Sequence, residues 1–171
     1  MKRIGFAATL VLFLTGVALC GEPETSVTYN PWTGDATLDA TLGDLNLEAD
    51  RDRDAFLSDL STSYGIPRLK LDEMVVKGKM RLGDIFMAVK ISKTAERPLD
   101  DVLEEYQSNR GKGWGVIARN LGIKPGSEAF HALKEDASAT LDRTRERKKG
   151  KQQGKGKEKP REKDKGKGKK K

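Results

Sequence analysis

Cysteine and histidine are almost absent from this 171-residue chain, which has one of each, Cys20 and His131. With one cysteine, no disulfide can form within the chain, so the fold must depend on an apolar core. A single histidine also rules out a metal site of several His and Cys ligands, and a catalytic His–Cys or His–His pair. We therefore expect a protein that is not an enzyme, with no metal, no cofactor and no small-molecule substrate.

Long hydrophobic runs are also scarce, and the longest covers residues 4–19, directly after two basic residues. A polar stretch, GEPETS, follows, and this order is typical of a secretory signal peptide. The run lies at the lower limit for crossing a bilayer, roughly 17 residues. We expect export to the periplasm, cell envelope or extracellular space, with a signal peptide at 1–20 cleaved after Ala18 or Cys20. Lipidation of Cys20 is an alternative, which Leu19 disfavours because Gly, Ala or Ser normally precedes a lipidated cysteine.

Acidic residues are few at the other end, where residues 143–171 hold sixteen Lys/Arg and four Asp/Glu, a net charge of +12. Since the whole chain is +7 and the first twenty residues contribute +2, residues 21–142 carry −7. Such a basic segment cannot bury enough apolar surface to order itself, so we expect disorder from about residue 150. The basic residues expected to bind an anionic envelope surface or polymer are Arg143, Arg145, Arg147, Lys148, Lys149, Lys151, Lys155, Lys157, Lys159, Arg161, Lys163, Lys165, Lys167, Lys169, Lys170 and Lys171.

The opposite charges of body and tail allow a second use of the tail. It can fold back on the acidic body, for example on Asp100, Asp101 or Glu104, and be displaced by a partner such as another envelope protein.

Residues 21–50 are polar and rich in turn signals. Ala36, Leu38, Ala40 and Leu42 alternate with polar residues, a period of two that predicts a strand. We expect an extended arm with a short strand or hairpin.

From residue 51 the apolar residues recur with helical spacing, and six helices are expected at about 52–64, 69–76, 82–92, 98–106, 114–121 and 128–149. Gly65 ends the first helix, Pro98 opens the fourth, and Ser127 caps the last. The expected fold is therefore mainly all-α, a small bundle of five to six short helices over residues 51–142, with the N-terminal arm and the basic tail outside it.

Three glycines at 111, 113 and 115 raise the question of a nucleotide-binding loop. Both common glycine motifs need a strand before the first glycine, and here a helix is expected there. The glycine spacing fits neither motif. We expect these glycines to let the chain turn tightly beneath a buried Trp114.

Asp50, Asp52 and Asp54 alternate as they do at the start of a calcium-binding loop. Such a loop needs Gly at its sixth and Glu at its twelfth position, where this chain has Ala55 and Ser61. These aspartates are better interpreted as acidic residues at a helix N-terminus.

Asp100, Asp101, Glu104 and Glu105 form a carboxylate cluster on one expected helix. On an exposed helix face such a cluster serves solvation, whereas catalysis needs an apolar site that separates the pKa values. His131 has no partner His or Cys and is expected to pack or cap.

The stretch WGVIARNLGI, from Trp114, is similar to the first half of a helix-turn-helix, with a second helix starting at Ser127. The alternative function is therefore nucleic-acid binding through residues 114–133 and the basic tail. Glu128, Glu135 and Asp136 argue against it, because a helix that reads DNA is normally basic. The same corner is a candidate partner-facing surface, with Trp114, Lys124 and His131.

The segment GWGVIARNLGIKPGSEAFHALK, with LSTSYGIP and LGDIFMAVKISKTAERPLDDVLEEYQSN before it, resembles an uncharacterised family of exported bacterial helical proteins, many with a Lys/Gly-rich tail. The resemblance covers about residues 27–134. It implies export and a helical body, and it implies no activity.

Overall fold

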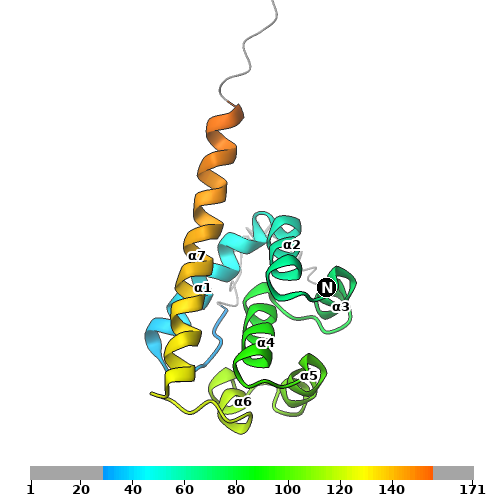
Figure 1. Cartoon of the computed structure of the whole chain (residues 1–171), viewed down its shortest axis with the longest axis vertical. Coiled ribbons are helices and arrows are strands. Elements are labelled where there is room, and N and C mark those ends of the chain that lie inside the picture. The colour runs from blue at the N-terminus through cyan, green and yellow to red at the C-terminus, as the bar shows by residue number, and fades with distance from the viewer. Residues whose placement is uncertain (1–28, 156–171) are drawn as a thin grey trace, which may run out of the picture.

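The computed structural model describes residues 29–155, with side chains described up to residue 150, and in this part of the chain it contains helices and no strand (Figure 1). The all-α expectation is confirmed. The seven helices of the described part are α1 (Ala36–Asp50), α2 (Arg53–Tyr64), α3 (Arg68–Val76), α4 (Leu82–Thr94), α5 (Leu99–Ser108), α6 (Trp114–Asn120) and α7 (Glu128–Lys155).

Helix α4 is the centre of the bundle. Every residue from Leu82 to Ser92 is buried, and α1, α2, α3, α5 and α7 all contact it. A helix that is apolar on all sides is normally buried in this way. Asp84, Lys90 and Ser92 are its buried polar residues, and only 8% of Lys90 is exposed. Its ammonium forms an ion pair with Asp136 of α7 and lies 5.2 Å from the ring centre of Tyr64, which together offset its removal from water.

Helix α1 corrects the expectation of an extended arm with a strand. Its buried residues are Leu38, Leu42, Leu45 and Ala49, spaced by four, three and four, which is a helical period. The period of two arose because Ala36 and Ala40 were counted as inward-facing, and both are exposed. Alanine tolerates exposure and is the best helix former, so this alternation did not require a strand.

Helix α1 begins at Asp35, whose carboxylate accepts a hydrogen bond from the Leu38 N–H at 2.8 Å. This is a standard N-cap. Since α1 also packs on α4 and α7, residues 36–50 belong to the bundle and are not an arm outside it.

Helices α1 and α7 lie side by side and run in the same direction (Figure 1). Three ion pairs show the direction, because Asp35, Asp44 and Glu48 meet Lys134, Arg145 and Lys148 in the same order. Figure 1 also shows the C-terminal part of α7 projecting beyond the other helices.

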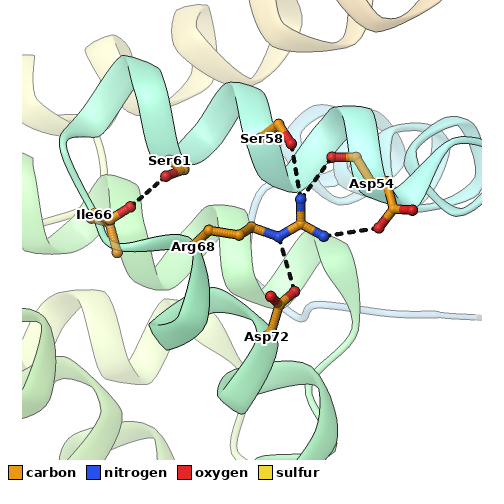
Figure 2. A network of polar contacts seen from close by, with 6 residues as sticks. All are labelled: Asp54, Ser58, Ser61, Ile66, Arg68 and Asp72. Atoms are coloured by element: carbon orange, nitrogen blue, oxygen red, sulfur yellow. Dashed lines mark hydrogen bonds and ion pairs between the residues drawn. The ribbon is translucent and has the colours of Figure 1, made fainter.

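Arg68, at the start of α3, connects that helix to α2 (Figure 2). Its guanidinium donates to the carboxylate and the carbonyl of Asp54 and to the Ser58 hydroxyl, and its Nε donates to Asp72. Nearby, the Ser61 hydroxyl donates to the Ile66 carbonyl at 2.7 Å. The link fixes the angle between two helices separated by a short turn.

Most expected helix boundaries are confirmed. Gly65 has a left-handed φ of 65° after α2, and Gly122 has a φ of 94° after α6. The Ser127 hydroxyl accepts from the Phe130 N–H at 3.2 Å at the start of α7. Pro98 immediately precedes α5 rather than being its first residue.

The end of α7 differs from expectation, because the helix continues through Lys155 instead of ending near residue 149. Lys and Gln are good helix formers, and extending an existing helix adds one hydrogen bond per ordered residue. The expected signal peptide, Cys20 and residues 156–171 lie outside the described residues. Between residues 29 and 155, no helix is both long and apolar enough to span a bilayer.

Candidate functional site: an aromatic cleft over a buried carboxylate

Residues 29–34 form a strap that crosses the N-terminus of α6. The N–H groups of Trp114 and Gly115 donate to the carbonyls of Pro31 and Trp32 at 2.8 and 3.1 Å. These are N–H groups that a helix start leaves without an internal partner. The strap therefore occupies the position that a phosphate takes in a nucleotide-binding loop.

Glycine is required where the strap meets α6. A Cβ at Gly115 would lie 2.3 Å from the Thr33 carbonyl oxygen, and one at Gly113 would lie 2.5 Å from Trp32. Gly113 also has a φ of 86°, which disfavours other residues. The expected tight turn beside a buried Trp114 is confirmed for Gly111 and Gly113, whereas Gly115 lies within α6 and serves the close approach of the strap.

Asp84, in the first turn of α4, lies at the centre of the site and is only 9% exposed. One carboxylate oxygen, Oδ1, accepts from the Tyr29 hydroxyl at 2.9 Å and from the Trp114 indole N–H at 2.7 Å. The other, Oδ2, accepts from the Arg81 N–H at 3.4 Å and the Tyr106 hydroxyl at 3.5 Å. These donors hold the strap, α4, α5 and α6 around one acceptor.

Burial raises the pKa of Tyr29 and of Tyr106 above the ordinary tyrosine value, and the charge of Asp84 raises both further. Both hydroxyls therefore stay protonated and act as donors at neutral pH. Gly83 makes room for this arrangement, because a Cβ there would lie 2.7 Å from the Tyr29 hydroxyl oxygen.

A cleft of about 280 Å³ opens above this cluster. Tyr29, Trp32, Tyr106 and Trp114 contribute aromatic lining, and Asp84 lies among them. Tyr106 and Trp114 stack with ring centres 5.0 Å apart.

Trp32 is the unusual member of this lining. It is 55% exposed and has a φ of 47°, a left-handed conformation that is uncommon for a bulky residue. Strained backbone concentrates at functional sites, and the exposed indole of Trp32 adds apolar surface to a cleft that already has three other aromatic residues.

Two short basic loops border the cleft, 77–81 between α3 and α4 and 110–113 between α5 and α6. The Arg110 guanidinium donates to the Gly78 carbonyl at 3.3 Å and so joins them. A second groove of about 420 Å³ lies beside them and shares Tyr106 with the cleft. We refer to Lys77, Lys79, Arg81, Arg110 and Lys112, all of them exposed, as the basic rim.

The second charged region is the seam between α7 and the acidic faces of α1 and α2. Arg145 pairs with Asp44 at 2.7 Å, Lys148 with Glu48 at 3.6 Å, and Arg147 with Asp59. At the start of α1, Lys134 pairs with Asp35, and this hydrogen bond lowers the pKa of the Asp35 carboxyl.

The described part of the basic segment therefore meets α1 and α2, whereas fold-back was expected on α5. On α5, Asp100 instead pairs with Lys70. Arg143 and Lys149 are exposed on α7, Lys151 and Lys155 belong to its last turns, and the other expected polyanion-binding residues lie outside the described residues.

The candidate partner-facing corner is only partly exposed. Lys124 and His131 are exposed, so His131 does not take the packing role expected for it. Trp114 is 2% exposed and cannot face a partner, because its indole ring is enclosed and its N–H is bound to Asp84.

The helix-turn-helix alternative receives little support from the exposed face at the start of α7. Glu128 and Glu135 are exposed there, and their charge opposes the approach of a phosphate backbone, whereas Asp136 pairs with Lys90.

Sequence reasoning missed the central role of Asp84 and of the strap. In the sequence, Asp84 has only the pattern of a favourable charge in the first turn of a helix, and residues 29–32 belong to a stretch that is rich in turn signals. The available signal was the buried-helix pattern of α4, since a carboxylate in such a helix needs several donors.

Comparison with known proteins identifies no relative: no family model, curated protein or solved structure matches the chain. The resemblance to exported helical proteins therefore stays a prediction.

Proposed function

We propose that this protein is an exported, non-enzymatic interaction module whose basic C-terminal segment, residues 143–171, binds anionic polymers or surfaces. The charge layout supports this, because that segment is +12 whereas residues 21–142 carry −7. The start of the chain supports export, because its basic, apolar and polar stretches follow the order of a signal peptide.

The observation that carries the proposal is the way α7 leaves the body. Lys148 contacts Glu48, close to the end of α1 at Asp50, and α7 continues to Lys155. Each further helical residue extends the chain by about 1.5 Å. Lys151 and Lys155 are thus carried beyond the carboxylates of α1, on the projecting end of α7 in Figure 1.

The magnitude of the charge makes such binding effective. Near an anionic bilayer each Lys or Arg contributes up to about 1 kcal/mol. Because Arg145, Arg147 and Lys148 already pair with the body, the binding falls mainly to residues 151–171.

The test replaces every Lys and Arg in residues 151–171 of the full chain with Gln. A control chain keeps the composition of residues 156–171 in scrambled order, since electrostatic binding depends on charge and not on sequence. Binding to anionic vesicles is measured by co-sedimentation at about 0.05 M and about 0.3 M salt, because screening shortens electrostatic reach from about 14 to about 6 Å over that range.

We expect the Gln variant to lose vesicle binding and the scrambled chain to retain it, with both the native and scrambled chains released at higher salt. Equal binding by the Gln variant and the native chain would disprove a role for the basic segment.

Export is tested separately by the intact mass of the protein recovered from cell fractions. A chain that begins after Ala18 or Cys20 in the exported fraction is expected. An intact Met1 chain in the cytoplasm would contradict export and favour the nucleic-acid alternative, and acyl chains on Cys20 would indicate a lipoprotein.

A further inference from the structure

The basic rim is a cluster of positive charge on an acidic body, in which Lys77 is paired with Glu73 of α3. Residues 77–81 and 110–112 contain five basic residues and no acidic one, while residues 21–142 as a whole carry −7. The two loops are far apart in sequence and are brought together by the hydrogen bond from Arg110 to Gly78. Lys112 donates a hydrogen bond at 3.0 Å to the side chain of Asn109, which lines the cleft.

An aromatic surface lies directly beside this rim. Trp32 is 55% exposed at the cleft despite its positive φ, and Tyr106, whose ring stacks on Trp114, lines both the cleft and the neighbouring groove. An exposed indole ring held in a strained conformation costs free energy, and such strain concentrates where it serves ligand binding.

The carboxylate of Asp84 indicates which ligands fit. An ionised carboxylate accepts about four hydrogen bonds, and the contacts of Oδ2 are long, at 3.4 and 3.5 Å. Oδ2 can therefore exchange one of these long contacts for a hydrogen bond from a ligand hydroxyl group, whereas the carboxylate repels a phosphate placed against it. Asn30 and Asn109 add amide groups at the edge of the cleft.

A sugar ring with an acidic substituent matches all three features. Its flat C–H face packs against Trp32, its hydroxyls donate to Asp84 and to amide oxygens, and its sulfate, phosphate or carboxylate meets the basic rim. The cleft of about 280 Å³ is near the lower end of small-molecule sites, roughly 300–1,000 Å³, and accommodates one or two sugar rings. The adjoining groove lets an oligosaccharide continue past Tyr106.

We infer that the cleft beside Trp32 and the basic rim form a binding site for an acidic oligosaccharide. Single-stranded nucleic acid fits less well, because such sites offer several stacking platforms in succession along a positive groove. Here one Trp is exposed and a carboxylate faces the ligand. This site is on the helical body and goes beyond the proposed binding by the basic segment.

The test uses the full chain with Lys and Arg of residues 151–171 replaced by Gln, so that the basic segment does not contribute. The probe is a heparin hexasaccharide, a sulfated oligosaccharide, and binding is measured by calorimetry and by tryptophan fluorescence. In this chain we expect saturable binding with a change in tryptophan emission, because Trp32 lies in the cleft.

Two substitutions address the site from different sides. Trp32→Ala and Arg110→Gln are each expected to weaken binding about tenfold, as loss of an aromatic or arginine anchor does, and Trp32→Tyr is expected to restore most of it. Matched controls are Leu69→Ala, an apolar residue 72% exposed on α3, and Lys93→Gln, an exposed cation at the far end of α4. The controls are expected to bind like the parent, and all variants must keep the parent's thermal midpoint.

Three outcomes would overturn the inference. Oligothymidylate of equal charge binding as tightly as the hexasaccharide would point to a nucleic-acid site. Equal weakening by Lys93→Gln and Arg110→Gln would indicate charge without a defined site. Absence of hexasaccharide binding to the Gln chain, with retention by the native chain, would leave all binding to the basic segment. Conversely, unchanged vesicle binding by the Gln chain contradicts only the proposed role of that segment.

Discussion

The strap and the seam are two ways in which the first and last segments of the described part of the chain, residues 29–155, are held to the body. The strap is joined by the hydrogen bond from Tyr29 to the buried Asp84 and by backbone contacts that only glycine permits. The seam is joined by ion pairs whose side chains stay partly in contact with water, such as Arg145–Asp44.

The difference teaches where the fold tolerates change. Buried hydrogen bonds to a charged acceptor are strong, and leaving a buried donor or acceptor without a partner is costly. Exposed ion pairs contribute little and are screened by salt. Substitutions at the strap should therefore lower the free energy of unfolding strongly, and salt should change that loss little. Substitutions in the seam should have small effects that depend on salt.

The largest effect is expected from Gly115→Ala. Its methyl group would lie 2.3 Å from the Thr33 carbonyl oxygen, so the strap must move, at a cost of about 3 kcal/mol in unfolding free energy. Gly43→Ala is the control, because a Cβ in that helix meets nothing within 4 Å and should stabilise by about 1 kcal/mol. Chemical denaturation measures both, and equal effects would show that the strap is not closely packed.

Asp84→Asn is expected to destabilise the fold by about 2 kcal/mol, because the amide replaces one acceptor oxygen with a donor. The Trp114 indole and the Tyr29 hydroxyl both depend on that carboxylate. Raising the salt concentration should leave this loss unchanged. A strong salt dependence would mean that Asp84 acts as a surface charge.

Alkaline pH should weaken the strap through Tyr29. Its pKa is raised in the folded protein by burial and by Asp84, so its stabilising contribution is complete below the unfolded value of about 10 and is lost as the pH rises above it. Between pH 10 and pH 11 we expect the native chain to lose about 1 kcal/mol more than Tyr29→Phe. Tyrosinate absorbance recorded alongside denaturation checks this, and parallel losses in both proteins would contradict it.

Acid should weaken the start of the seam. The Asp35 pKa is lowered by the hydrogen bond from Lys134 and by that from the Leu38 N–H, so its contribution is present above the unfolded value of about 3.9 and is lost as the pH falls through the folded value. Asp35→Ala should cost about 1 kcal/mol at neutral pH, as the loss of an N-cap does. The difference between the native chain and the variant should shrink as the pH falls below about 3.9, and a difference that stays constant over that fall would exclude titration of Asp35 as its source.

The smallest effect is expected from Arg145→Gln. This pair with Asp44 is exposed, so its loss should cost about 0.5 kcal/mol, and the difference should vanish in concentrated salt. Asp44→Asn is the matched change on the other helix and should give the same small loss. A loss of stability several times larger would show that the seam, like the strap, is sensitive to substitution.

Some features follow from the sequence because they depend on neighbouring residues. Gly65, Gly122 and Ser127 end or begin helices through contacts within one turn, and the buried α4 is evident from its run of apolar residues. The incorrect prediction of a strand at α1 has an equally local cause. In a segment that mixes alanines and leucines, the same residues fit both a period of two and a helical period. The burial of Leu38, Leu42, Leu45 and Ala49 decides between them, and burial depends on α4 and α7.

By itself, then, the sequence determined the helical class, the helix caps and the opposite charges of body and tail. Only the tertiary structure decided that Tyr29 meets Asp84 across 55 positions, that Arg110 meets Gly78 across 32, and that Arg145 meets Asp44 across 101. The physical reason is range: capping and periodicity act over three or four residues, whereas a cleft needs side chains that approach one another only after the helices have packed.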